Sequence, residues 1–412
     1  MEGNALGKIS DRDIRAGATT LLVGQIFQVA AAFTANLVLV RYILPEEFGR
    51  FAIVLATASL LLSVLSIRVN SLIIRVPQAE ITEHLEERYF SYLTIETMLA
   101  MVLGLLWIGL TRNAGMWDFV LVVLVCVQHW TQQNKSFFER SMPYVRLSLV
   151  ETGCSVFAHC AGVFAALSGA GVVALYCREF ILTVAMFASL ALMGGITWRR
   201  LRWLSLSEWT GIMREGRGIW LDAAMESGYQ RITVLLAGLM GGDRGAGLFF
   251  QAQRLAILPN QILSPLIGRL VVNLLRREER PGHRKRLRDL LLISLAPVLG
   301  LAAAVTVLFA DPVVPWLFGA DWAMAANLLR ALAGVIMFAT LFEVLKSYCF
   351  VIRSMRTLFL GRVMQYLALG ALPVLVGIGL VGDGLTSLAL CLSIGLAMAF
   401  LLVGGVLLRT GR

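Results

Sequence analysis

The sequence is poor in charge. Only 15% of its 412 residues are Asp, Glu, Lys or Arg, whereas soluble domains carry about a quarter. A soluble protein with 58% hydrophobic residues would expose apolar patches large enough to cause aggregation. A disordered chain is excluded as well, because such chains are polar and highly charged. The low charge therefore excludes an ordinary soluble protein.

Cysteine pairs and metal-ligand motifs are also missing from the sequence. All six cysteines lie in apolar runs without a C-x-x-C motif, and the four histidines are scattered. These patterns predict neither a disulfide framework nor a metal site. A P-loop and a G-x-G-x-x-G motif after a strand are absent too. We therefore expect no bound cofactor and no enzyme.

Long apolar runs account for the composition. A transmembrane helix takes about 20 residues, and charged or turn-rich breaks separate the apolar runs into spans of this length. The sequence predicts an all-α polytopic membrane protein of about 12 transmembrane helices, at 17–40, 49–75, 91–111, 115–134, 147–168, 170–193, 218–240, 246–273, 289–310, 322–346, 357–381 and 385–408.

The basic residues orient these spans. With the N-terminus inside, cytoplasmic segments hold 26 of the 36 Lys and Arg residues, among them Lys346 and Arg362, and outer segments hold four. This bias in short loops predicts that both termini are cytoplasmic. The net charge of +10 is then explained by topology, so no nucleic-acid partner is expected.

An internal repeat divides the chain. An offset of 198 residues aligns Gly49 with Gly247 and Phe51 with Phe249, and it brings the outer turns 41–48 and 241–246 together. We expect two parallel six-helix bundles, 1–204 and 205–412, around a central cavity. This layout is typical of carriers that alternate access around a central site. A duplication without a transport role remains the alternative.

Three segments resemble a known family. Residues 38–54 surround the turn Leu44-Pro45-Glu46-Glu47, residues 245–271 contain G-x-F-x-x-A-x-R-L, and residues 313–333 contain L-F-G-x-x-W-x-x-A-x-x-L-L-R. All three resemble polysaccharide transporters, the Wzx-type lipid-linked oligosaccharide flippases of the multidrug/oligosaccharidyl-lipid/polysaccharide exporter superfamily. The chain departs from the family in the span 218–240, where members often carry an Asp and Tyr229-Gln230-Arg231 stands here.

The resemblance implies a function. A flippase of this kind moves a polyprenyl-diphosphate-linked oligosaccharide across the bacterial cytoplasmic (inner) membrane for exopolysaccharide, capsule or O-antigen biosynthesis. The expected partners are this lipid-linked oligosaccharide, membrane lipids, a polysaccharide polymerase and chain-length proteins. The family also places the first, second, seventh and eighth spans around the central cavity.

Polar side chains inside the spans indicate the binding site. A charge at the bilayer centre costs at least about 2.5–3.5 kcal/mol, and a diphosphate needs cations with forked donors. We predict substrate binding by two groups of arginines and by two polar helical stripes; the alternative for each arginine is a structural ion pair or snorkelling to the membrane surface. The predicted residues are Arg68, Arg231, Arg254, Arg178, Arg330, Gln25, Gln28, Asn36, Gln251 and Gln261.

Two acids lie on the span 218–240. Asp222 and Glu226 are spaced i, i+4 and therefore share a helix face. They are candidates for coupling transport to an H⁺ or Na⁺ gradient. The alternative is that they neutralise Arg68 or Arg231 across the cavity.

Two other functions remain open. A cation-coupled multidrug exporter of the same superfamily would need an acidic, less cationic cavity. A polysaccharide polymerase or ligase would need a large outer loop with Arg or His, whereas the longest outer loop, 311–321, has no basic residue.

Overall fold

The computed structural model describes residues 11–74, 76, 80–111, 114–139, 144–268, 272, 275, 278, 280–371 and 384–409. Their regular structure is helical. The first half holds α1 (Asp11–Tyr42), α2 (Pro45–Leu65), α3 (Val69–Ile73), α4 (Glu83–Thr111), α5 (Met116–Glu139), α6 (Tyr144–Leu167) and α7 (Val173–Leu192). The second half holds α8 (Leu206–Leu266), α10 (Pro281–Phe318), the 3₁₀ helix η3 (Ala320–Trp322), α11 (Ala325–Ala331), α12 (Ala333–Val351), α13 (Met355–Gly370) and α15 (Gly384–Arg409).

This helix order confirms the predicted fold class. Each of the twelve expected spans contains described helical residues, and eight helical segments are long and apolar enough to cross a membrane. Residue 75 and the stretches 269–271, 273 and 372–381 of the expected spans lie outside the described residues. We therefore treat the chain as an integral membrane protein.

Two of the spans form the long element α8. Its helical run is broken at Gly242, where φ is 63° and ψ is −162°. Glycine reaches this backbone conformation without a steric penalty. The break gives a first arm, 206–241, and a second arm, 243–266, and it confirms the turn that the sequence predicts between the seventh and eighth spans.

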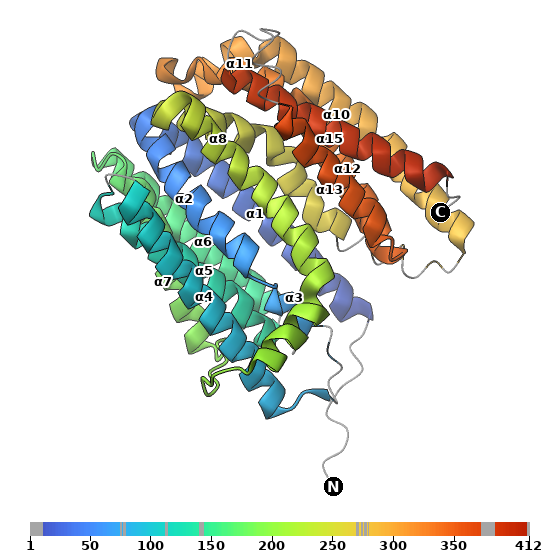
Figure 1. The fold of residues 1–412 in the computed structure, drawn as a ribbon. Coiled ribbons are helices and arrows are strands. Elements are labelled where there is room, and N and C mark those ends of the chain that lie inside the picture. The colour runs from blue at the N-terminus through green and yellow to red at the C-terminus, as the bar shows by residue number, and fades with distance from the viewer. Residues whose placement is uncertain are drawn as a thin grey trace.

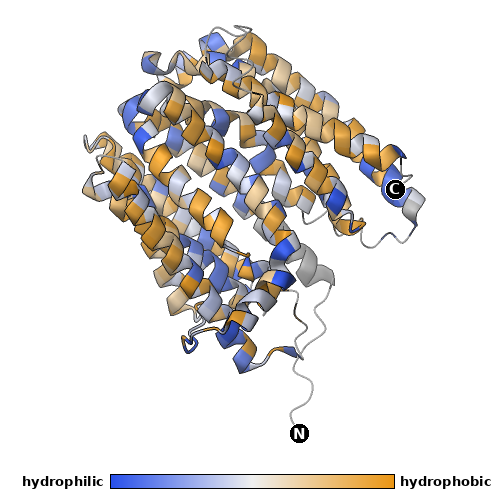
Figure 2. Cartoon of the chain, in the orientation of Figure 1, coloured by the Kyte–Doolittle hydropathy of each residue, from blue (hydrophilic) through white to orange (hydrophobic). Residues whose placement is uncertain are grey.

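The two halves lie side by side, with the blue and green helices next to the yellow to red ones (Figure 1). Hydrophobic residues dominate the helices at the two flanks, and hydrophilic residues gather at helix ends and between the halves (Figure 2). One hydrophobic cluster runs through both halves and contains Phe48, Phe249 and Trp322. The polar residues between the halves are therefore enclosed by apolar packing.

The outer ends of the halves meet in a reciprocal contact. A Cβ atom at Gly49 would overlap the backbone oxygen of Asp243, and a Cβ atom at Gly247 would overlap that of Pro45. The repeat offset of 198 residues relates the two contacts, because it aligns Gly49 with Gly247 and Pro45 with Asp243. The ion pair between Arg244 and Glu46, at 3.1 Å, lies beside them. We call these residues the outer clasp: Pro45, Glu46, Gly49, Asp243, Arg244 and Gly247.

At the inner end, the first arm of α8 packs on the first half. The rings of Trp209 and Tyr92 lie 4.5 Å apart, and Tyr89 donates a hydrogen bond of 3.0 Å to Glu215. The indole of Trp220 donates to the backbone oxygen of Val64 at 2.8 Å. The first arm therefore follows the first half from the inner end to the outer clasp, and the boundary at residue 204 stays a prediction.

Candidate functional site

A cavity of about 400 Å³ lies between the two halves. Three arginines line it: Arg178 from α7, Arg231 from the first arm of α8 and Arg254 from the second arm. The break at Gly242 turns the chain back and so brings the last two, which are 23 positions apart, to one cavity. The lining also includes one carboxylate, one imidazole and four amides, from Glu179, His159, Gln128, Gln230, Gln253 and Gln261.

Arg254 is held by residues of both halves. Its Nη1 donates a hydrogen bond of 2.7 Å to Oδ1 of Asn36 on α1. The Nδ2 of Asn36 donates to Oε1 of Gln251 at 3.0 Å, and both amides are buried. The Nε2 of Gln251 donates back to Oδ1 of Asn36 at 3.4 Å, and this buried amide pair holds the guanidinium in place. Asn36 and Gln251 therefore position Arg254 from behind the cavity.

The other two arginines differ in their partners. Arg178 is 6% exposed, and its Nη2 donates to Glu179 at 2.5 Å. Its guanidinium also lies 5.9 Å from the ring centre of Phe51. Arg231, by contrast, makes no hydrogen bond or ion pair with any residue in the described part of the chain. Glu179 thus compensates the charge of Arg178. Among the described residues, Arg231 and Arg254 form no ion pair with a carboxylate, so their charges remain available to an anionic ligand.

This lining suits an anionic group with hydroxyl-bearing substituents. Guanidinium groups bind phosphate oxygens with two parallel donors. The amides can both donate to and accept from hydroxyl groups. Three arginines and one glutamate also leave a net positive charge in the cavity. The cavity can therefore hold a polyanion next to neutral polar groups.

Arg68 lies in a second pocket and not in the central cavity. The sequence predicts one continuous span over 49–75, but α2 ends at Leu65 and α3 begins at Val69. Arg68 stands in this break in the left-handed conformation, with φ 64° and ψ 60°. A non-glycine residue in this conformation costs of order 1–3 kcal/mol and persists only when its surroundings hold it.

A buried carboxylate holds this break. Glu96 of α4 is 3% exposed, and it accepts hydrogen bonds from the Ser66 hydroxyl at 2.8 Å and from the Ile67 backbone N–H at 3.3 Å. On α5, Oε1 of Gln133 accepts from the backbone N–H of Asn70 at 3.0 Å. Side chains of α4 and α5 thus satisfy the backbone groups that the interrupted helix leaves free.

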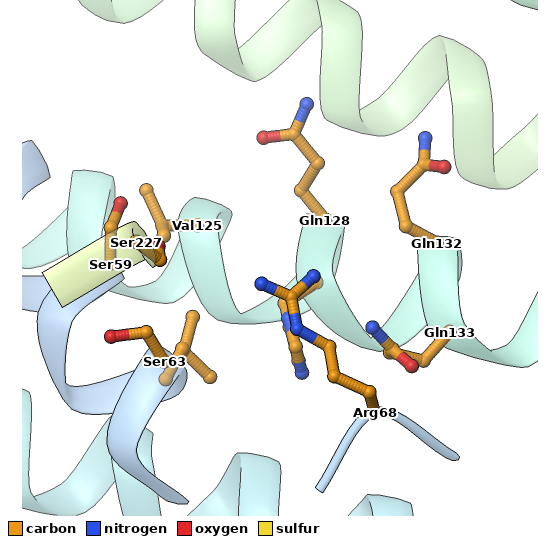
Figure 3. A pocket seen from close by; sticks show the side chains of 10 residues that line it. Ser59, Ser63, Arg68, Val125, Gln128, Gln132, Gln133 and Ser227 are labelled. Carbon is orange, nitrogen blue, oxygen red and sulfur yellow. The ribbon is translucent and has the colours of Figure 1, made fainter. Parts of the chain in front are cut away.

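The pocket around Arg68 has a volume of about 260 Å³. Figure 3 shows Arg68 pointing from the break toward Gln128, Gln132 and Gln133 of α5, with serines to one side. Gln128 lines both this pocket and the central cavity, so the two sites are neighbours. The remaining lining residues are Ser59, Leu62, Ser63, Val125, His129 and Ser227.

The predicted acids form a charge cluster inside the second half. Asp222 accepts from Nε of Arg362 at 3.0 Å, and Glu226 pairs with Nη2 of Arg362 and Nζ of Lys346, each at 3.1 Å. Lys346 also pairs with Glu343 at 2.6 Å. Three carboxylates and two cations therefore lie together. Both acids are therefore charge-balanced, as the alternative expects, but among the described residues their partners are Arg362 and Lys346 and not Arg68 or Arg231.

The other predicted residues lie apart from the cavity. Gln28 donates to Thr152 of α6 at 3.0 Å and so packs inside the first half. Gln25 is half-buried and lines neither the central cavity nor the Arg68 pocket. Arg330 pairs with Asp311 near the outer end. Gln261, in contrast to these residues, lines the central cavity together with Arg178, Arg231 and Arg254.

Sequence reasoning missed two groups of polar residues, the cations of the charge cluster and the amides of α5. Lys346 and Arg362 count as cytoplasmic loop residues in the sequence, but Arg362 is only 3% exposed inside the second half. The amides Gln128, Gln132 and Gln133 lie in the expected span 115–134, where the polar run after Cys126 was a usable signal. The i, i+4 spacing of Gln128 and Gln132 already places them on one helix face.

Comparisons with known proteins agree with this architecture. Residues 38–327 match a family described as polysaccharide biosynthesis protein. No curated protein matches the sequence. The structure is similar to the lipid II flippase MurJ in an inward closed conformation, with TM-score 0.71, 10% identity, and coverage of 95% of this chain and 87% of that one.

Two further solved structures share the fold. An inward-facing multidrug resistance MATE family transporter of the MOP superfamily has TM-score 0.61 and 15% identity, with 98% of this chain and 96% of that chain covered. A MOP superfamily transporter from Pyrococcus furiosus has TM-score 0.59 and 14% identity, with 96% of each chain covered. At these identities the likeness establishes the fold, and the chemistry has to be argued from the cavity.

Proposed function

Because the chain belongs to the polysaccharide biosynthesis protein family, whose model covers residues 38–327, we propose that it is a flippase. Its cargo is a polyprenyl-diphosphate-linked oligosaccharide, which it moves across the bacterial cytoplasmic membrane by alternating access. The glycan serves a surface polysaccharide, so a polymerase and chain-length proteins act on it afterwards.

The observation that carries this proposal is the cluster of Arg178, Arg231 and Arg254 around one cavity between the halves. A diphosphate is the part of the cargo that is hardest to move through lipid, because an unpaired charge in the bilayer is expensive. Guanidinium groups that replace its hydration lower this cost. The amides of the lining suit the attached glycan. An excess of arginine argues against cationic drugs as cargo.

The charge cluster of the second half supports coupling to protons. Asp222 and Glu226 are balanced by Arg362 and Lys346, and Glu343 adds a third carboxylate to two cations. One carboxylate therefore exceeds the cations of the cluster, and one bound proton restores neutrality. We propose that uptake and release of this proton couples transport to the H⁺ gradient.

Deletion of the gene in a strain without paralogues tests the cargo. Surface polysaccharide should be lost, and lipid-linked repeat units should accumulate on the inner side of the membrane. Normal polysaccharide output in that strain contradicts the proposal. Increased resistance to cationic drugs on overexpression would instead favour the multidrug exporter.

Complementation with single variants tests the site. Arg254→Ala should reduce export at unchanged protein level, because one charged hydrogen-bonding group contributes about 1.5–3 kcal/mol. The matched control is Arg217→Ala, an exposed arginine on the inner part of the same helix α8. Full complementation by Arg254→Ala removes this residue from the binding site.

A further inference from the structure

The Arg68 pocket is distinct from the central cavity in shape and in charge. It is bounded by α2, the break that follows it, α5 and Ser227 of α8, and it shares only Gln128 with the lining of the larger cavity. At about 260 Å³ it has room for one sugar ring and not for an oligosaccharide. A cargo seated on the three arginines would therefore reach it only with one neighbouring sugar.

The charge of the pocket defines what it can bind. Arg68 contributes the only guanidinium in the lining, and the lining contains no carboxylate. Among the described residues, the guanidinium of Arg68 forms neither a hydrogen bond nor an ion pair. The fork of such an arginine can donate two parallel hydrogen bonds to one anionic group, and a single carboxylate balances its charge.

The neutral groups define the rest of the ligand. Gln128, Gln132 and the Ser59 hydroxyl can donate and accept hydrogen bonds, and the Ser63 hydroxyl, which donates to the Leu60 backbone oxygen at 2.8 Å, can accept one. The Nε2 atom of His129 is buried without a hydrogen bond in the described part of the chain, and it lies 3.7 Å from the Glu96 carboxylate behind the lining. Such a ring of amides and hydroxyls around a single cation fits a ligand with one negative charge and several hydroxyl groups.

The backbone at Arg68 supports a binding role as well. Its left-handed conformation is strained, and Glu96 and Gln133 hold the break from two other helices. Strain that is held by surrounding side chains occurs where a group has to be presented in a fixed direction. Figure 3 shows the Arg68 side chain pointing from this break into the pocket.

We propose that the Arg68 pocket is a subsite for an acidic monosaccharide, a hexuronate, within the glycan whose diphosphate lies on Arg178, Arg231 and Arg254. This inference rests on the proposed function and adds the substrate class. The carboxylate of the hexuronate pairs with Arg68, and its ring hydroxyls meet the amides and serines. Gln128 contacts the cargo on both sides of the boundary between the two sites.

Ligand-induced stabilisation of the purified full chain tests the subsite. The probes are sodium glucuronate, glucose and sodium pyrophosphate at equal ionic strength, and the readout is the shift of the thermal unfolding midpoint with concentration. Glucuronate should stabilise the wild type, and glucose should not. Arg68→Asn should weaken glucuronate binding by about tenfold or more, and it should leave pyrophosphate binding unchanged.

Matched variants separate binding from folding. Asparagine tolerates the left-handed conformation, and Arg353→Asn makes the same change at the other left-handed arginine, φ 56°, in the turn between α12 and α13. That control should bind glucuronate like the wild type. Gln132→Met removes a pocket amide without touching the backbone break, and it should weaken glucuronate binding even if Arg68→Asn does not fold.

The outcomes distinguish this inference from the proposed function. The subsite is overturned if glucuronate does not bind the wild type or binds no better than glucose. It is also overturned if glucuronate binding is unchanged in both pocket variants. Pyrophosphate binding that is unaffected by Arg254→Gln counts against the diphosphate site instead. If Arg254→Gln loses pyrophosphate binding while the pocket variants keep glucuronate binding unchanged, the flippase proposal stands and the hexuronate subsite is wrong.

Discussion

Replacing Gly49 by alanine should open the outer clasp. The new methyl group would overlap the backbone oxygen of Asp243, which cannot rotate away as a flexible side chain could. Overpacking of this kind costs about 1–3 kcal/mol, and the cost applies only while the halves are in contact. The equilibrium between closed and open outer ends should therefore shift by about 5-fold to 150-fold toward the open state.

Gly247→Ala should have a similar effect, because its methyl group would meet the backbone oxygen of Pro45 in the reciprocal contact. The double variant should shift the equilibrium by less than the product of the two single effects, because a small separation of the helices that relieves one overlap in the closed state also relieves the other. This expectation follows from the geometry and does not depend on the identity of the cargo.

Hydrogen exchange of the peptides 43–50 and 241–248 measures this equilibrium in the purified protein. Exchange in both peptides should accelerate by the same factor in either single variant. The control is Gly153→Ala on α6, where a Cβ atom meets nothing within 4 Å and the helix gains a little stability. Exchange at the outer turns that matches this control would refute the closed clasp.

The remaining predictions concern the second half and the inner segment before it. Arg362→Gln should lower the stability in detergent by about 3–5 kcal/mol, because Asp222 and Glu226 then lose a buried partner; a chemical denaturation curve measures this loss. Ser205→Ala should cost about 1 kcal/mol in the same assay, since its hydroxyl accepts from the Glu208 backbone N–H at the start of α8. The Ser205 backbone N–H and the Arg202 guanidinium lower the pKa of Glu208 from 4.5 to about 2. The stabilisation by Glu208 should therefore be complete above about pH 4.5 and disappear as the pH falls toward 2, and this pH dependence should be absent in Glu208→Gln.

Features with a local cause were predictable from the sequence. Apolar runs gave the helices, and paired glycines gave the turn at Gly242, because a left-handed backbone position needs that residue. Arg231 and Arg254 stood out since a charge within a span requires a polar surrounding. The structure brings both to one cavity, and whether they bind cargo stays a prediction.

Features with a distant cause were not predictable. The break at Arg68 contains neither proline nor glycine, and Glu96, which holds it, lies 30 positions beyond Ser66 in the chain. Arg362 resembles an ordinary loop arginine until the packing of α8 and α12 surrounds it. Helical periodicity placed Gln28 and Asn36 on one stripe, but a stripe can face two neighbours, and Gln28 faces α6.

The lining of the central cavity has an electrical consequence for transport. Arg178, Arg231 and Arg254 against Glu179 leave two uncompensated positive charges when the cavity is empty, and a dianionic diphosphate would cancel them. Moving one charge through 100 mV corresponds to about 2.3 kcal/mol. The loaded protein would then change orientation almost without electrical work, whereas the empty protein carries its charge through the field. A membrane that is negative inside would therefore favour the return of the empty carrier.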